Sequence, residues 1–125
     1  MTINNNNANG ETMNPGPASN APQPPPIAGE GDMWAEILAI LPVDDPLRPH
    51  AAARRQMGID KYGVPLQANN GRKAVVDLFE EQLDSIVYAQ QWSIEVMGID
   101  SDALALALHM RWDAINNARR LLRYL

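Results

Sequence analysis

Residues 74–125 read AVVDLFEEQLDSIVYAQQWSIEVMGIDSDALALALHMRWDAINNARRLLRYL, and this stretch decides the fold of the chain. Its first half carries apolar side chains at helical spacing, namely Val75, Leu78, Phe79, Leu83, Ile86, Val87 and Ile94. Its second half does the same with Leu104, Leu108, Trp112, Ile115 and Leu122. Gly98 is a helix stop and Ser101 a helix cap. The pattern predicts long helices over residues 70–97 and 101–125, joined by a short turn into an antiparallel hairpin.

Two shorter helices are expected before this hairpin. Asp32 is a good N-cap, and the apolar positions that follow it at helical spacing are Trp34, Ile37, Leu38 and Leu41. Pro42 ends this first helix. A second helix begins at Asp45-Pro46, or later if Pro49 delays it, and ends at Gly58 or Gly63. The expected fold is therefore all-α, with the two shorter helices covering the open apolar side of the hairpin.

Residues 1–31 have a different composition from the rest of the chain. They combine an asparagine run at Asn4 to Asn7 with scattered glycine and with the stretch Pro24-Pro25-Pro26. So few large apolar side chains cannot offset the entropy of ordering, which predicts a disordered tail followed by a helical domain over residues 32–125. The tail is interpreted as a linker, and the alternative is a ligand for a proline-recognition domain.

Composition limits the classes of function. The 125-residue chain has no cysteine, which excludes disulfides and thiolate chemistry. Three of its 15 acidic residues and none of its 10 basic residues lie in the first 32 positions, which leaves 12 acids against 10 bases. That balance argues against binding duplex nucleic acid. No apolar run reaches membrane-spanning length and the amino terminus lacks secretory features, so a cytoplasmic protein without a membrane partner is expected.

Four carboxylates form the most informative group, at Asp77, Glu80, Glu81 and Asp84. Their spacing brings them to one side of the third helix, opposite the apolar stripe. Because carboxylates so spaced repel one another, a cation is expected to face them, and Mg²⁺ prefers such oxygen ligands. The hypothesis assigns Mg²⁺ to Asp77, Glu81 and Asp84. The alternative is a solvated acidic face that pairs with lysine or arginine.

Basic residues precede the third helix at Arg54, Arg55, Lys61 and Arg72. Lys61 and Arg72 are expected to neutralise phosphates, and Tyr62 to stack on a base. Asn70 belongs to the expected helix entrance, where free backbone N–H groups attract anions. In the alternative interpretation, the two cations pair with the carboxylates and Tyr62 packs in the loop.

Residues 54–91, RRQMGIDKYGVPLQANNGRKAVVDLFEEQLDSIVYAQQ, resemble small helical proteins of tailed-phage genomes that share K-Y-G, N-G-R and E-E-x-x-D-x-x-x-Y. Within them, FEEQLDSIVY is similar to the second acidic helix of the MazG-like all-α nucleotide pyrophosphohydrolases. In that superfamily an E-x-x-D pair helps to hold Mg²⁺ around a nucleoside triphosphate. The resemblance carries this role to Glu81 and Asp84. The enzymatic hypothesis assigns the activation of water to Glu80, Glu81 and Asp84 together.

The first acidic helix of that superfamily has no counterpart before residue 70, where Glu36 stands alone. A homo-oligomer that supplies acids from another subunit would restore the set, and a relative that binds nucleotides without cleaving them would not need it. The expected function is a phage-type MazG-like domain that binds a nucleotide and, in the enzymatic case, hydrolyses it with Mg²⁺ in the host cytoplasm. The alternative is a non-catalytic helical module that sequesters a nucleotide signal or docks on a host protein.

Overall fold

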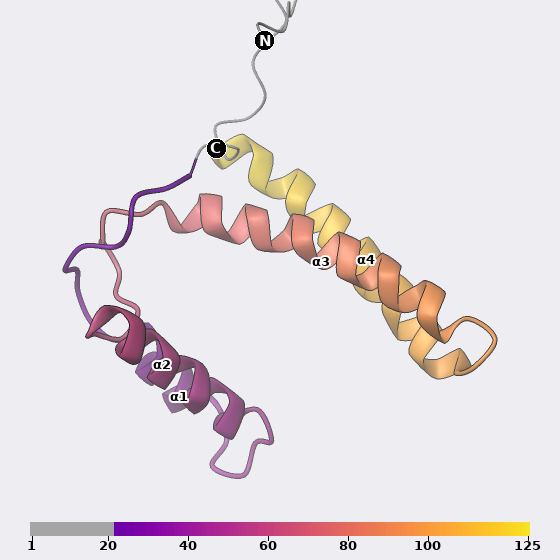
Figure 1. Ribbon diagram of the computed structural model, residues 1–125, viewed down its shortest axis with the longest axis horizontal. Coiled ribbons are helices and arrows are strands. Elements are labelled where there is room, and N and C mark those ends of the chain that lie inside the picture. The colour runs from indigo at the N-terminus through magenta and orange to yellow at the C-terminus, as the bar shows by residue number, and fades with distance from the viewer. Residues whose placement is uncertain (1–21) are drawn as a thin grey trace, which may run out of the picture. The chain divides into compact units, whose positions relative to one another are not determined.

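The structure, a computed structural model, describes residues 22–125, and the expected disorder of residues 1–21 lies outside these residues. The described part contains four α-helices and no β-strand (Figure 1). They are α1 (Met33–Ile40), α2 (Arg48–Tyr62), α3 (Ala74–Val96) and α4 (Ser101–Leu121), and a 3-10 turn follows at Leu122–Tyr124. The predicted all-α fold class is confirmed.

The described residues group into two compact units. The helix-pair unit runs from Gln23 to Arg72 and contains α1 and α2, whereas the hairpin unit runs from Lys73 to Leu125 and contains α3 and α4. The expectation that the short helices cover the hairpin stays a prediction. Each unit is therefore described by itself.

The hairpin unit is the antiparallel pair that the sequence predicts, with α3 and α4 packed along their length (Figure 1). Small side chains dominate the seam between the helices. The buried ones are Ala89 and Ser93 of α3 and Ala107, Ala114 and Ala118 of α4, of which Ala107 has no exposed surface. Small side chains let two helix backbones approach closely, so much of the pairing comes from dense backbone packing.

The termini of the two long helices differ in detail from the prediction. Gly98 has a φ of 76° and lies in the turn, as expected. Asp100 rather than Ser101 is the N-cap of α4, because its carboxylate Oδ1 accepts a 3.0 Å hydrogen bond from Ala103 N–H. The predicted start of the third helix near Asn70 is wrong. Asn69 and Gly71 have φ values of 53° and 82°, which an α-helix cannot include, so α3 begins only at Ala74.

In the helix-pair unit, α1 begins as predicted, with the carboxylate of Asp32 accepting a 2.9 Å hydrogen bond from Ala35 N–H. The helix α2 starts at Arg48, later than Asp45-Pro46, with Pro49 in its first turn. Gly63, at a φ of 80°, ends α2, whereas Gly58 lies inside it. Of the two alternatives at each end of this helix, the structure selects the later one.

Two arginines of α2 hold α1 in place. The Arg48 guanidinium donates to the carbonyl oxygens of Leu38 and Leu41, which closes the carboxyl end of α1. The Arg55 guanidinium lies 2.8 Å from the Asp32 carboxylate at the other end. The hydrogen bond from Arg55, followed by that from Ala35 N–H, holds the pKa of Asp32 below its usual 3.8. Both ends of α1 are thus fixed by polar contacts.

The chain before α1 pairs with the loop before α3. Glu30 and Ala68 exchange backbone hydrogen bonds of 2.8 and 2.9 Å, and Ile27 N–H donates to Asn70 O at 2.8 Å. Gly29 lies where the two segments approach, because a Cβ there would stand 2.1 Å from Ala68 O. The paired structure therefore begins before the expected tail boundary at residue 31.

Candidate functional site

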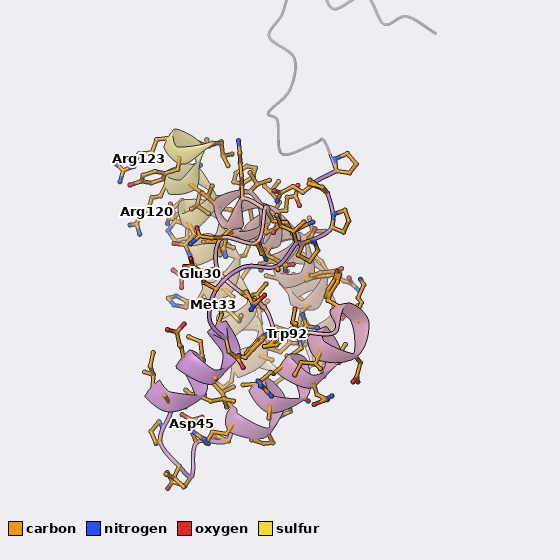
Figure 2. All side chains as sticks on the ribbon, turned by 90° about the vertical axis from the view of Figure 1, so that its left-hand side faces the viewer. Glu30, Met33, Asp45, Trp92, Arg120 and Arg123 are labelled. Carbon is orange, nitrogen blue, oxygen red and sulfur yellow. The ribbon has the colours of Figure 1, made fainter. Side chains whose placement is uncertain are left out.

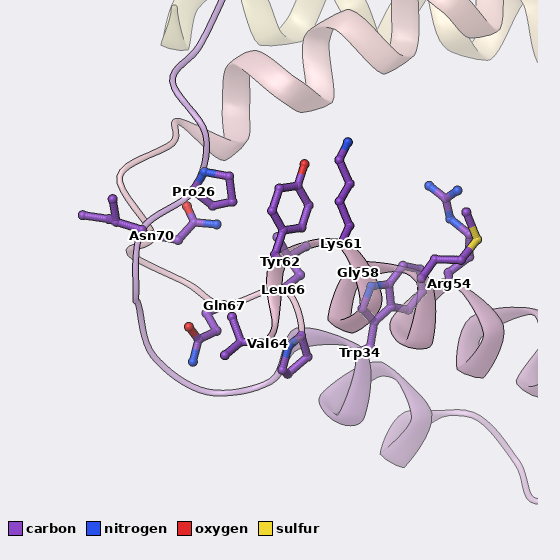
Figure 3. A pocket seen from close by; sticks show the side chains of 13 residues that line it. Pro26, Trp34, Arg54, Gly58, Lys61, Tyr62, Val64, Leu66, Gln67 and Asn70 are labelled. Carbon is purple, nitrogen blue, oxygen red and sulfur yellow. The ribbon is translucent and has the colours of Figure 1, made fainter.

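A cavity of about 380 Å³ lies entirely within the helix-pair unit (Figure 3). Both helices of the unit and the paired loop segments contribute to its wall. The wall includes Trp34, Arg54, Gly58, Lys61, Tyr62 and Asn70. Ligand-binding cavities typically have volumes of about 300–1,000 Å³, so this one can admit a small molecule with one or two rings.

Trp34 and Gly58 form one wall of the cavity. The Trp34 indole of α1 lies beside Gly58 of α2 (Figure 3). A Cβ at Gly58 would meet no atom within 4 Å, so no packing contact requires glycine at this position. Glycine inside a helix costs roughly 0.5–1 kcal/mol relative to alanine. The space above Gly58 is thus open to a ligand.

The rim of the cavity carries a tyrosine ring beside cationic side chains. Tyr62 and Lys61 project in the same direction from the end of α2 (Figure 3), and Lys61 Nζ lies 5.1 Å from the centre of the Tyr62 ring. Both side chains are exposed, and Arg54 is an exposed cation two turns earlier on α2. The rim can therefore offer a ring surface for stacking and positive charge for an anion.

Asn70 also lines the cavity, as a buried residue that holds the loop. Its Oδ1 accepts a 3.2 Å hydrogen bond from Arg72 N–H, and its carbonyl oxygen accepts the hydrogen bond from Ile27. Arg72 itself donates to Pro24 O at 2.8 Å and is not among the lining residues. The structure thus brings three of the expected substrate-binding residues, Lys61, Tyr62 and Asn70, to one cavity. Arg72 fastens the wall of that cavity instead.

The four carboxylates lie elsewhere, on α3 of the hairpin unit. Asp77 and Glu80 are half-buried, and Glu81 and Asp84 are exposed. Their spacing places them on the side of α3 that faces away from the Ala107 seam, as predicted. Within residues 22–125, no three acidic or histidine side chains come close enough together to hold a metal ion. A magnesium site at Asp77, Glu81 and Asp84 would therefore need further ligands.

Sequence reasoning identified neither the apolar residues that line the cavity nor the part that Trp34 and Gly58 play in it. Trp34 was predicted as an apolar position of the first helix, and Gly58 as one of two alternative ends of the second helix. A signal was present, because Arg54, Gly58, Lys61 and Tyr62 follow one another at i, i+4, i+7 and i+8 and so share one face of α2. The distance in sequence between Trp34 and this face concealed that they line one cavity.

No protein-family model matches this chain, and no curated protein or solved structure is significantly similar to it. In the described part of the chain, every helix is too short or too polar to cross a membrane.

Proposed function

We propose that this protein binds a nucleotide, or a small anion derived from one, in the cavity of the helix-pair unit. The observation that carries the proposal is the open space between Trp34 and Gly58, with the Lys61 ammonium and the Tyr62 ring at its rim. A nucleotide offers the matching parts, which are a flat apolar base and a charged phosphate chain.

The energetics favour insertion of the base with the phosphates at the rim. Stacking of a base on an aromatic side chain contributes about 1–3 kcal/mol, and Trp34 and Tyr62 supply two such surfaces. The cations of Arg54 and Lys61 are exposed, so phosphates that contact them keep much of their hydration. Binding of this kind requires no metal ion.

The enzymatic form of the proposal is a MazG-like, Mg²⁺-dependent nucleoside triphosphate pyrophosphohydrolase of phage type, acting in the host cytoplasm. Glu80, Glu81 and Asp84 would activate water, and Asp77 would complete the metal ligands together with acids from a second subunit. The rival is a module that sequesters a nucleotide signal without cleaving it. The absence of a convergent group of carboxylates within residues 22–125 favours the rival.

Isothermal titration with nucleoside triphosphates, nucleoside monophosphates and free nucleosides tests the binding proposal. We expect Lys61→Gln to weaken triphosphate binding about tenfold, because one direct charge contact is lost. Arg120→Gln is the matched control, since Arg120 extends into solvent from the end of α4 (Figure 2). Equal affinities of the two variants, or no binding of any compound, would refute the proposal. Release of pyrophosphate with Mg²⁺ would separate the enzyme from the sequestering module.

Gly58→Ala tests the position of the base. Since the new methyl group meets no protein atom, the unliganded protein should gain roughly 0.5–1 kcal/mol of stability from the better helix former. The same methyl group would occupy the space against Trp34, so binding should weaken severalfold. Thermal unfolding and titration of one variant measure both effects. Unchanged affinity in the stabilised variant would show that the base does not lie there.

A further inference from the structure

The hairpin unit carries a second set of large apolar side chains outside its buried seam. On α3 and α4 they recur at intervals of four and seven residues, and we name this set the aliphatic flank. It consists of Leu83, Val87, Ile94, Leu104, Leu108 and Ile115, with Trp112 at its edge. The exposed fractions reach 63% at Val87, 59% at Ile94 and 57% at Trp112.

Helical geometry places these side chains on one flank of the hairpin. On α3, successive members lie four and seven residues apart, which keeps them on one face, and the same holds on α4. The Gln90–Arg111 side-chain hydrogen bond joins the two helices along this flank. The opposite flank is different in kind, because Ser85, Tyr88, Trp92 and Met110 enclose a groove there.

The aliphatic flank is large enough for a stable interface. Its five exposed members, Leu83, Val87, Ile94, Leu108 and Trp112, have exposed fractions of 38% to 63%, which correspond to on the order of 500 Å² of mostly apolar surface, while Leu104 and Ile115 are half-buried. That lies within the range for the largest patch on a typical monomer, at about 300–600 Å². It approaches the roughly 800 Å² that each partner contributes to a standard interface, before any polar rim is added.

A helix with two apolar seams is typical of a bundle with more than two helices. In this unit α3 and α4 use one seam for each other and leave the other seam open. A second hairpin of the same kind would supply two more helices with matching rows. The result would be a four-helix bundle in which both open seams are buried.

Charges at the edges of the flank select one arrangement of two copies. Glu80 lies one heptad before Val87 and Arg119 one heptad after Trp112, so each borders the flank. Glu80 and Arg119 lie at the same level of the hairpin. The Asn117 side chain donates a hydrogen bond to Gln82 across the antiparallel helices, Glu80 lies two residues before Gln82, and Arg119 lies two residues after Asn117. The Arg119 guanidinium stands 5.8 Å from the Trp112 ring, which holds it at this edge.

A two-fold axis parallel to the helices would place α3 of one copy on α4 of the other at equal level. Glu80 of each copy would then face Arg119 of the other, and this attraction would occur twice. An axis across the helices would place α3 on α3 and separate these charges. The surface is thus complementary to itself in one orientation.

We infer that the aliphatic flank binds the same flank of a second copy of this chain, about a two-fold axis parallel to the helices. The product is a four-helix bundle with α3 of each copy on α4 of the other. This inference does not depend on a ligand in the cavity, because the cavity lies in the other unit.

Sedimentation equilibrium of the full chain tests the inference, with Val87→Arg and Tyr88→Arg as a matched pair. The two residues are neighbours on α3 with similar exposure, 63% and 67%, but they belong to opposite flanks. The unmodified chain should be a dimer at micromolar concentration. Val87→Arg should raise the dissociation constant at least about a hundredfold, because each copy would bury an unpaired charge, and Tyr88→Arg should leave it nearly unchanged.

Charge reversal tests the orientation. Glu80→Arg and Arg119→Glu alone should each weaken the dimer about tenfold, and the double variant should recover most of the loss. Failure of the double variant to recover would overturn the parallel axis.

Three outcomes would overturn the inference as a whole. One is an unmodified chain that remains monomeric up to about 100 µM with a melting temperature independent of concentration. Another is an equal effect of Val87→Arg and Tyr88→Arg. The third is a monomer in which Val87→Arg lowers the melting temperature, which would mean that the chain's own helices cover the flank. Should Val87→Arg fail to fold, the concentration dependence of melting in the unmodified chain still decides the result.

Discussion

The two units of this protein are stabilised in different ways. The helix-pair unit depends on directed polar contacts, such as the Arg55–Asp32 ion pair and the donation of Arg48 to the end of α1. The hairpin unit depends on close packing of small side chains around Ala107, and it leaves large apolar side chains exposed. The cavity in the helix-pair unit lies beside α2, whereas the alanine seam brings α3 and α4 into direct contact.

This difference suggests different partners for the two units. A cavity whose wall is fixed by hydrogen bonds has a defined shape, which suits a small ligand. A hairpin whose largest side chains lie outside its seam suits another protein surface, because their burial is still available as a driving force. The following changes would break the two stabilising schemes separately.

The largest effect is expected from Gly29→Ala. The added Cβ would stand 2.1 Å from Ala68 O, a contact that only separation of the two backbone segments can relieve. We expect a loss of roughly 1–3 kcal/mol in the free energy of unfolding, together with weaker ligand binding, because the cavity wall includes this loop. Thermal unfolding and nucleotide titration measure these effects. For unfolding, Gly58→Ala is the control, since its Cβ meets nothing, and an equal loss of stability in both variants would contradict the explanation.

A slightly smaller effect is expected from Ala107→Leu in the hairpin unit. Ala107 has no exposed surface, so a larger side chain must push α3 and α4 apart at a cost of about 1–2 kcal/mol. Ala105→Leu on the exposed side of the same helix should be neutral within about 0.5 kcal/mol. Chemical denaturation of both variants tests this. Ligand binding should survive Ala107→Leu, and its loss would show that the units do not act independently.

The smallest expected effect is a loss of stability at acid pH through Asp32. Because the pKa of Asp32 is lower in the folded state than its usual 3.8, the ionised carboxylate favours folding above that pH. The contribution is present at neutral pH and is lost as the pH falls below about 3.8 through the lower, folded-state pKa. Melting temperatures of the parent and Asp32→Asn should therefore differ near pH 7 and converge as the pH falls through the folded-state pKa of Asp32. If the two melting temperatures still differ in acid, the stabilisation by Asp32 does not come from the charge of its carboxylate.

Much of the fold could be predicted because local signals were strong. The apolar spacing of Phe79 and Ile86, the turn at Gly98 and the cap at Asp32 act within a few residues. The start of α3 failed because Asn69 adopts a left-handed conformation that asparagine allows but does not require. Asp100 and Ser101 are both good caps, and spacing alone cannot rank two neighbours.

The candidate site was predictable only in part. Lys61 and Tyr62 were identified from a cluster that is local in sequence, and both line the cavity. Trp34 was not identified as a site residue, because its position beside Gly58 arises from the packing of α1 on α2. Arg72 was assigned to a ligand because it is a cation just before the third helix, whereas its guanidinium donates to the Pro24 carbonyl oxygen. Partners distant along the chain cannot be recovered from local pattern.

The pairing of Glu30 with Ala68 has a consequence for the order of folding. The segments it joins are separated by long stretches of chain, as in the bond from Gly29 N–H to Gln67 Oε1 across 38 residues. At a synthesis rate of about 5–20 residues per second, the first segment waits roughly 2–8 seconds for its partner to be made. The hairpin, in contrast, can close outward from Gly98 through contacts between near neighbours, which is a fast process. The nascent chain therefore contains residues 27–30 well before the loop that completes the ligand cavity exists.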